Sequence, residues 1–238
     1  EEGLHHIAFH DALTGLPNRR RFHEHLEAAV QRAQADPHDA YAVMFLDFDR
    51  FKLINDSLGH NAGDEFLVQV SRRIQASLRP QDIVARLGGD EFAVLVAHLE
   101  GESAAVVLAE RLMEALRKPF PVAGTELMTS ASIGITFSAL GYTRTEDVLR
   151  DADTAMYKAK AAGKARYALF DASLHTEVAD RLRLEGDLRH AIDDRLLTLA
   201  YQPICELGGA TPGRIAGFEA LVRWVHPADG SITPAGFL

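Results

Sequence analysis

The chain has 238 residues, of which 47% are hydrophobic and 25% are charged, and its formal net charge is −9. This negative charge argues against nonspecific binding to nucleic acid, which needs a basic surface, although a few local Lys and Arg residues can still bind an anionic small ligand. The single cysteine, Cys205, excludes an internal disulfide framework. The chain also has no apolar run near the roughly 20 residues of a membrane span and no signal peptide. Because its opening stretch, "EEGLHHIAFH", looks like the end of a helix that starts upstream, we expect a cytoplasmic piece of a longer protein, whose parent could be membrane-anchored.

Helical and strand-like patterns alternate over residues 1–170. Helices are predicted over 19–34, where Pro17 and Asn18 mark the start, over about 61–78, over 103–120, and over 144–163, where Gly163 ends the helix. Strands are predicted over 41–49, as a hairpin within 79–96, over 127–137 and over 164–170. This order predicts an α+β domain of ferredoxin-like or palm type, in which helices flank a central, mostly antiparallel sheet.

Near Asp171 the pattern starts again. A helix is predicted over 181–194, followed by strands over 196–207 and 214–224. We therefore expect one domain over residues 1–170, and a linker helix with the incomplete start of a second domain over 171–238.

The predicted hairpin carries two adjacent carboxylates at its tip, in "RLGGDEF" at 86–92. A Gly-Gly pair followed by acidic residues is often an ordinary turn. However, Asp47 and Asp49 lie two apart at the end of another strand, so they point to the same face. They could form a solvated strand end, but a concentration of carboxylates is relieved by a hard divalent cation, and Mg²⁺ commonly binds one or two carboxylates together with a nucleotide's phosphates.

Residues downstream of these carboxylates fit the rest of a nucleotide. Lys52 and the lysines on the last helix, Lys158, Lys160 and Lys164, could meet phosphates, although such lysines are by default a solvated surface. Gly88 and Gly89 would let a ligand approach the backbone closely. Asn55 and Asp64 could bind a purine, because a carboxylate accepts hydrogen bonds from the N1 and N2 hydrogens of guanine and an amide can donate to N3.

Three motifs together resemble the diguanylate cyclase, or GGDEF, family: "DALTGLPNRR" at 11–20, "DFDRFKLINDSLGHNAGD" at 47–64 and "RLGGDEF" at 86–92. The resemblance implies a palm-like fold related to nucleotidyl cyclases and the condensation of two GTP into cyclic di-GMP and two pyrophosphates. It implies metal ligation by Asp47, Asp90 and the backbone carbonyl of Phe48, with Mg²⁺ or Mn²⁺ as the cofactor. It further implies catalytic roles for Asp90, Glu91 and Lys52, and substrate binding by Asn55, Asp64, Gly88, Gly89, Lys160 and Lys164.

The resemblance has one departure and several consequences. Where the family has Gly-Arg-Asn, this chain has Gly163, Lys164 and Ala165, so the bidentate fork of Arg is lost. Because each subunit would hold one GTP, catalysis would need a two-fold homodimer, whose pairing we expect an upstream sensor to control. The competing hypothesis is a silent GTP-binding or cyclic di-GMP-sensing module that regulates an attached phosphodiesterase.

An Arg-x-x-Asp pair, Arg79 and Asp82, precedes the hairpin. In the family, this pair at nine residues before the first glycine forms an inhibitory product site, and Arg79 stands at that offset from Gly88. The planar fork of Arg suits guanine or phosphate. The alternative is an ordinary loop with a surface ion pair; Arg111 is a weaker candidate for the same site.

The last segment resembles the start of an EAL phosphodiesterase domain, in "YQPICEL" at 201–207 and "GFEALVRWVHP" at 217–227. The resemblance implies a metal ligand at Glu219, with Gln202 and Arg223 near the substrate. Such TIM-like barrels need about 250 residues, so we expect no phosphodiesterase activity from this chain.

Overall fold

The computed structural model describes residues 8–172, 183–184, 186–207, 214–226 and 230–232. The chain divides into two compact units, Glu1–Leu174 and His175–Leu238. Each unit is described by itself below.

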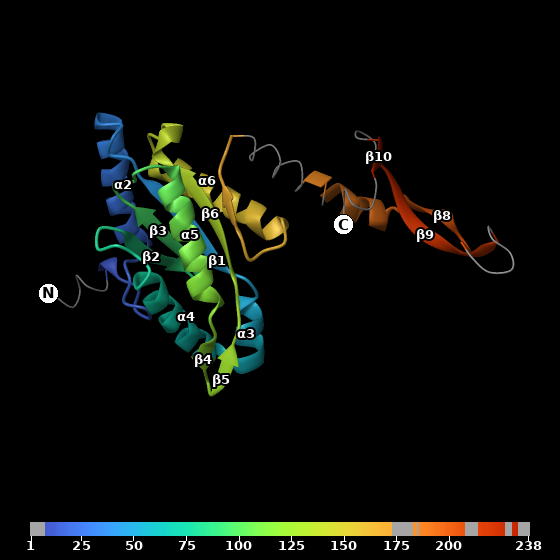
Figure 1. The fold of residues 1–238 in the computed structure, drawn as a ribbon, viewed down its shortest axis with the longest axis horizontal. Helices are drawn as coiled ribbons and strands as arrows, with labels where there is room; N and C mark the ends of the chain where they lie inside the picture. The colour runs from blue at the N-terminus through green and yellow to red at the C-terminus, as the bar shows by residue number, and fades with distance from the viewer. Residues whose placement is uncertain (1–7, 173–182, 185, 208–213, 227–229, 233–238) are drawn as a thin grey trace. The chain divides into compact units, whose positions relative to one another are not determined.

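The first unit is built on a sheet with the strand order β2-β3-β1-β6-β7 (Figure 1). Its strands are β1 (Ala42–Phe48), β2 (Ile83–Gly88), β3 (Glu91–Val96), β6 (Ala131–Phe137) and β7 (Tyr167–Leu169). Neighbouring strands are antiparallel except β6 and β7, which are parallel. The predicted α+β class and mostly antiparallel sheet are therefore confirmed.

Helices cover both faces of this sheet (Figure 1). Along β1 the side chains alternate, so that Met44 and Leu46 join the core beneath α4 (His60–Gln75) and α5 (Glu102–Arg117). Val43 and Phe45 join the opposite core, beneath α2 (Arg19–Ala35) and α6 (Thr145–Ala161). β1 is consequently buried on both sides, and its last residues are held rigidly where the candidate site begins.

Two local features differ from the sequence prediction. A short helix, α3 (Phe51–Leu58), directly follows β1, where no element was expected. A small hairpin of β4 (Phe120–Val122) and β5 (Thr125–Leu127) takes residues that were assigned to the end of a helix and the start of a strand. Pro119 explains why the helix predicted over 103–120 ends at Arg117, because the residue before a proline avoids the helical region and Lys118 is extended.

The second unit contains an antiparallel sheet with the strand order β10-β9-β8. Its strands are β8 (Leu197–Cys205), β9 (Ile215–His226) and β10 (Gly230–Ile232). Residues 183–184 and 186–193 are helical, and residues 181, 182 and 185 of the predicted helix lie outside the described residues. His226 Nε2 lies 3.0 Å from the Asp187 carboxylate, which ties the end of β9 to this helix.

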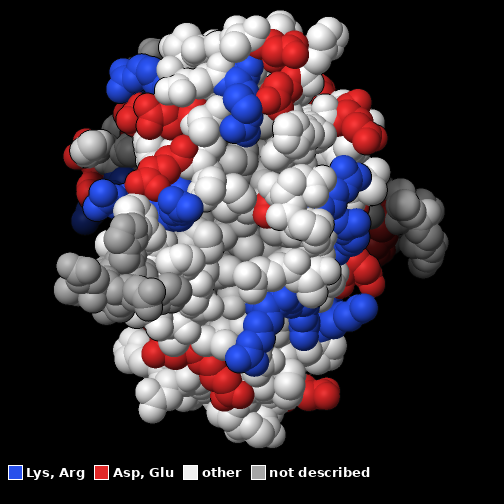
Figure 2. Space-filling view, turned by 90° about the vertical axis from the view of Figure 1, so that its left-hand side faces the viewer, with Lys and Arg blue, Asp and Glu red and all other residues white. Residues whose placement is uncertain are grey.

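Within the described ranges, no helix combines the length and the apolar character needed to span a membrane. On the face shown in Figure 2, acidic and basic side chains are interspersed around an uncharged area.

Candidate active site

The turn between β2 and β3 carries the glycines and the two adjacent carboxylates. Gly88 pairs with Glu91 across this turn, and both glycines have positive φ, +144° at Gly88 and +52° at Gly89. A Cβ built on either glycine has no heavy atom within 4 Å. Glycine is therefore required here by backbone conformation rather than by crowding, and the space above the turn is open to a ligand.

The Arg86 side chain holds this turn in place. Its Nε donates to the Gly89 carbonyl at 2.9 Å, and its Nη1 donates to both oxygens of Asp11 at 3.1 and 3.2 Å. The pair is largely buried, with side chains 12% and 22% exposed. Burial acts to raise the pKa of Asp11, but hydrogen bonds from Thr14 and the Arg86 guanidinium outweigh it and hold that pKa below its usual range.

The sequence prediction assigned no role to Arg86 or Asp11. They belong to two of the recognised motifs, "RLGGDEF" and "DALTGLPNRR", but they are 75 residues apart. Only the motifs' joint presence could have indicated that they meet. Through the contact between Asp11 and Arg86, the "DALTGLPNRR" motif supports the turn.

Asp47 and Glu91 face each other across the β1–β3 ladder as direct Cα partners. Burial raises the pKa of Asp47, as do the charges of Asp90 and Asp49, although a hydrogen bond from Lys160 opposes this. Burial likewise raises the pKa of Glu91, opposed by Arg19, whose Nη2 lies 3.5 Å from Oε2. The predicted concentration of carboxylates at this position is present.

Asp49 and the Phe48 ring are both buried, which the sequence alone did not indicate. Asp49 is only 6% exposed. Its carboxylate accepts hydrogen bonds from the Ser130 and Ser132 hydroxyls and from the Ala165 backbone amide, at 2.6–3.1 Å. It therefore anchors the surrounding loops, and the alternative of a solvated strand end is wrong. The Phe48 ring is buried against Phe66 and Phe92, so only its backbone can face a ligand.

The two predicted guanine-binding residues lie on neighbouring helices, Asn55 on α3 and Asp64 on α4. Asn55 is half-buried and Asp64 is exposed. A Cβ on Gly63 would lie 1.9 Å from Asn55 Oδ1, so the absence of a side chain at Gly63 is what allows the Asn55 amide its position.

The three predicted phosphate-binding lysines lie on two parts of the chain, one on α3 and two at or just after the end of α6. Lys52 is exposed in the first turn of α3, and Lys160, in the last turn of α6, places its Nζ 2.6 Å from Asp47 Oδ1. Lys164 does not lie on the last helix, because α6 ends at Ala161 and Lys164 has a left-handed backbone with φ +62°. Asp49 fixes this strained turn through the Ala165 amide.

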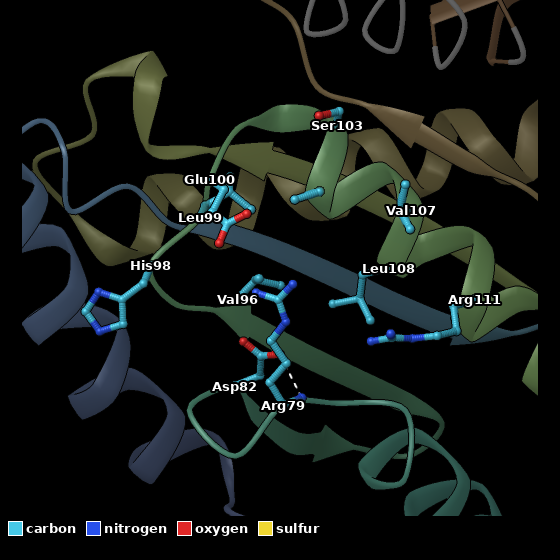
Figure 3. Close-up of a pocket in the computed structure, with 11 residues that line it drawn as sticks. Arg79, Asp82, Val96, His98, Leu99, Glu100, Ser103, Val107, Leu108 and Arg111 are labelled. Atoms are coloured by element: carbon cyan, nitrogen blue, oxygen red, sulfur yellow. Dashed lines mark hydrogen bonds between the residues drawn. The ribbon is translucent and has the colours of Figure 1, made fainter.

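Arg79 and Asp82 line a separate pocket of about 360 Å³ at the far end of β2 from the Gly-Gly turn (Figure 3). The Arg79 backbone amide donates to Asp82 Oδ2 at 3.0 Å. Asp82 Oδ1 is buried and has no hydrogen-bond partner among the described residues. The Arg111 side chain reaches the pocket from α5 and donates to the Ser77 carbonyl at 2.6 Å. The structure thus brings together the two predicted residues and the weaker candidate.

In the second unit, Gln202 on β8 and Glu219 on β9 are direct Cα partners. Arg223 is four residues further along β9, so its side chain lies on the same face as that of Glu219. Its Nη1 donates to the Val222 carbonyl.

The donor set at the turn determines which metal could bind. Within the described residues, no group of three or more His, Cys, Asp or Glu side chains is arranged to hold a metal ion. A metal bound wholly by protein side chains therefore does not fit this part of the chain. Mg²⁺ does fit, because it takes one or two carboxylates, keeps several waters and completes its shell with phosphate oxygens. Asp90 lies close enough to Asp47 for its charge to raise the pKa of Asp47.

Both units of the chain match families of known proteins. Residues 8–166 match the family model described as "Diguanylate cyclase, GGDEF domain", and residues 185–238 match that of the EAL domain. The bifunctional diguanylate cyclase/cyclic di-GMP phosphodiesterase MucR of Pseudomonas aeruginosa is 44% identical over 233 residues, which are 98% of this chain and 33% of that protein. The chain spans about a third of the length of the curated relatives it matches.

Solved structures show the same likeness. The GGDEF domain of TpbB, or YfiN, from Pseudomonas aeruginosa has a TM-score of 0.69 at 40% identity, covering 71% of this chain and 99% of that one. The coiled coil and GGDEF domain of DgcB from Caulobacter crescentus, solved in complex with c-di-GMP, has a TM-score of 0.65 at 27% identity, covering 71% of this chain and 88% of that one.

Proposed function

Residues 8–166 make this chain a member of the GGDEF diguanylate cyclase family, and we propose that its first unit condenses two GTP molecules into cyclic di-GMP and two pyrophosphates. The observation that carries the proposal is the placement of Asp47 directly opposite Glu91, beside an open Gly-Gly turn. Opposed carboxylates with raised pKa values repel each other, and such unfavourable arrangements are typical of functional sites.

Asp47, Asp90 and the Phe48 carbonyl would hold Mg²⁺. When bound, the metal would lower the pKa of the attacking 3′-hydroxyl and neutralise charge on the leaving pyrophosphate. Glu91 would lie beside that hydroxyl and accept its proton, for which a raised pKa suits a general base. Arg86 would hold the turn, and therefore Asp90 and Glu91, in one orientation.

The substrate would be held at both of its ends. Asn55 and Asp64 would bind the guanine edge between α3 and α4, with Gly63 leaving room for the Asn55 amide. Lys52, Lys160 and Lys164 would bind the phosphates. Lys164 supplies a point charge instead of a bidentate fork, so we expect weaker phosphate binding than an Arg would give.

The reaction needs a second GTP, which a second copy of the chain would present. Cyclic di-GMP has two equivalent phosphodiester bonds. A two-fold homodimer in which the two nucleotides face each other would let each 3′-hydroxyl attack the α-phosphate of the other GTP. The active site would then lie between the two copies.

The Arg79–Asp82 pocket would bind cyclic di-GMP. The buried, unpartnered Asp82 oxygen supports this, because an unsatisfied acceptor in a pocket is costly unless a ligand donates to it, and the guanine N1 and N2 hydrogens are suitable donors. The same observation favours a second candidate function, a cyclic di-GMP-sensing module that regulates an attached EAL domain.

One experiment separates these functions. The purified chain is incubated with GTP and Mg²⁺ and the products are resolved by chromatography, with Asp90→Ala as the inactive variant and Asp193→Ala, an exposed acid in the second unit, as the control. We expect cyclic di-GMP from the wild type and Asp193→Ala but not from Asp90→Ala. Absence of product from all three, with cyclic di-GMP binding retained in calorimetry, would leave the sensing module.

A further inference from the structure

Lys160 and Asp47 form a close ion pair in the candidate active site. Lys160 Nζ lies 2.6 Å from Asp47 Oδ1, and the side chains are 29% and 15% exposed, so both charges are substantially withdrawn from water. The lysine comes from the last turn of α6 and the aspartate from the end of β1, and these two elements pack together in the same unit. Their positions are therefore fixed by the fold rather than by flexible surface chains.

The pair sits within a group of like charges. Asp90 and Glu91 both lie close enough to Asp47 to interact with it electrostatically. In the described part of the chain, Lys160 is the residue that forms an ion pair with Asp47, while Arg19 pairs with Glu91 at 3.5 Å on the other side. Lys160 thus supplies the positive charge that the Asp47 end of this group requires when no cation is bound.

The proposed function gives Lys160 a different partner, because there it binds phosphate while Asp47 binds the metal. Mg²⁺ at about 2.1 Å from a carboxylate oxygen and an ammonium group on the same carboxylate repel each other. A triphosphate resolves the conflict, because it offers Lys160 a new anionic partner and brings negative charge to the metal.

We propose that Lys160 exchanges ion-pair partners: its ammonium group pairs with the Asp47 carboxylate when the site is empty and moves to the phosphates when the metal–nucleotide complex binds. This inference rests on the proposed function of the same site. Its consequence is that a free divalent cation binds weakly, because it must compete with Lys160, whereas the cation and the nucleotide bind together. The ion pair therefore couples occupation of the metal site to the presence of substrate.

The test measures cation binding without nucleotide. Mn²⁺ is titrated into the full chain and the free ion is followed by electron paramagnetic resonance, for wild type, Lys160→Met, Lys160→Arg and Lys118→Met. Lys118→Met removes the same charge at the exposed C-terminal end of α5. We expect Lys160→Met to bind Mn²⁺ about tenfold more tightly than wild type, from removal of one nearby positive charge. Lys160→Arg and Lys118→Met should stay near the wild-type affinity.

A second measurement guards against misfolding of Lys160→Met. Thermal unfolding with and without Mn²⁺ should show a larger cation-induced rise in Tm for Lys160→Met than for wild type, because tighter binding to the folded state gives more stabilisation. Binding of Mg²⁺ with a fluorescent GTP analogue should weaken in the same variant. Unchanged or weaker Mn²⁺ binding by Lys160→Met overturns the exchange. None of these readouts needs turnover. If the chain makes no cyclic di-GMP, the proposed function is wrong, but the Mn²⁺ measurements still test the exchange of Lys160 independently.

Discussion

At the scale of single residues, Glu91 shows how function opposes stability. Its carboxylate is ion-paired with Arg19, yet burial and the charges of Asp153, Asp47 and Asp90 raise its pKa. A raised pKa means that the folded state favours the protonated form. The ionised form present at neutral pH therefore destabilises the metal-free fold, and the destabilisation appears as the pH rises through the raised pKa.

We predict that Glu91→Gln makes the metal-free chain more stable than wild type at about pH 7, and that this difference disappears below the pKa range of free carboxyls, near pH 4. The Arg19 pair lost by the substitution is exposed and contributes little. Urea unfolding at the two pH values, in the presence of a chelator, measures the difference. Glu27→Gln, on the exposed side of α2, is the matched control. A Glu91→Gln chain less stable than wild type at pH 7 would show that the Arg19 pair outweighs the repulsion.

At the scale of elements, the contact between α3 and α4 sets the position of Asn55. A methyl group on Gly63 would lie 1.9 Å from Asn55 Oδ1, which is the end of a side chain that can rotate away. We therefore predict that Gly63→Ala folds but loses GTP affinity as Asn55→Ala does, by about ten- to a hundredfold for the lost hydrogen bond.

A double-mutant cycle checks this prediction. Because the Gly63 substitution would act through Asn55, Gly63→Ala with Asn55→Ala should bind GTP no more weakly than either single variant. Equilibrium titration of a fluorescent GTP analogue supplies the affinities, and circular dichroism confirms the fold. Additive losses in the double variant would mean that Gly63 serves the pocket by some other route.

The long helices α2 and α6 were predicted close to their observed bounds, because their apolar residues recur at helical spacing. α3 was missed because it has only eight residues and its N-cap is Arg50, whose φ of +67° is unusual for a non-glycine residue. β4 and β5 are three-residue strands, too short to show alternation. Their hairpin is held by tertiary contacts: Glu65 accepts a hydrogen bond from the Ala123 amide, and Arg73 lies 3.6 Å over the Phe120 ring.

In the candidate site, too, the sequence predicted some residues and missed others. The carboxylates, lysines and Gly-Gly turn were predicted because their motifs are contiguous in the chain. The supports around them were not, because they join residues far apart: Asp49 binds groups 81, 83 and 116 residues away, and Arg86 binds Asp11. A single sequence gives residue types and spacing, whereas such contacts depend on the register of β1 against β3 and β6.

At the scale of the whole molecule, the two ends of β2 carry different proposed sites. The Arg79 pocket lies at the start of the strand and the Gly-Gly turn at its end. We predict that cyclic di-GMP slows synthesis without competing with GTP. Arg79→Ala should raise the inhibitory concentration about ten- to a hundredfold, from the loss of charge-assisted hydrogen bonds, while the initial rate barely changes.

Progress curves with added cyclic di-GMP measure this effect. The bond that closes the loop comes from the Arg79 backbone amide to Asp82, so the substitution leaves the loop intact. Arg117→Ala, at the exposed end of α5, is the control. Identical curves for wild type and Arg79→Ala would remove the inhibitory role and leave an ordinary surface loop.

The proposed active site requires two copies of the chain, and this requirement can be measured without a structure of the dimer. If each turnover uses a metal-binding half-site from both copies, only pairs of two wild-type chains are active. Mixing wild type with an equal amount of Asp90→Ala, at fixed total concentration and after exchange, should therefore leave about a quarter of the activity of the unmixed wild type, from random pairing. Asp193→Ala mixed in the same way should leave it unchanged. A fall to about half would mean that each chain works alone, since activity would then follow the wild-type fraction linearly rather than as its square.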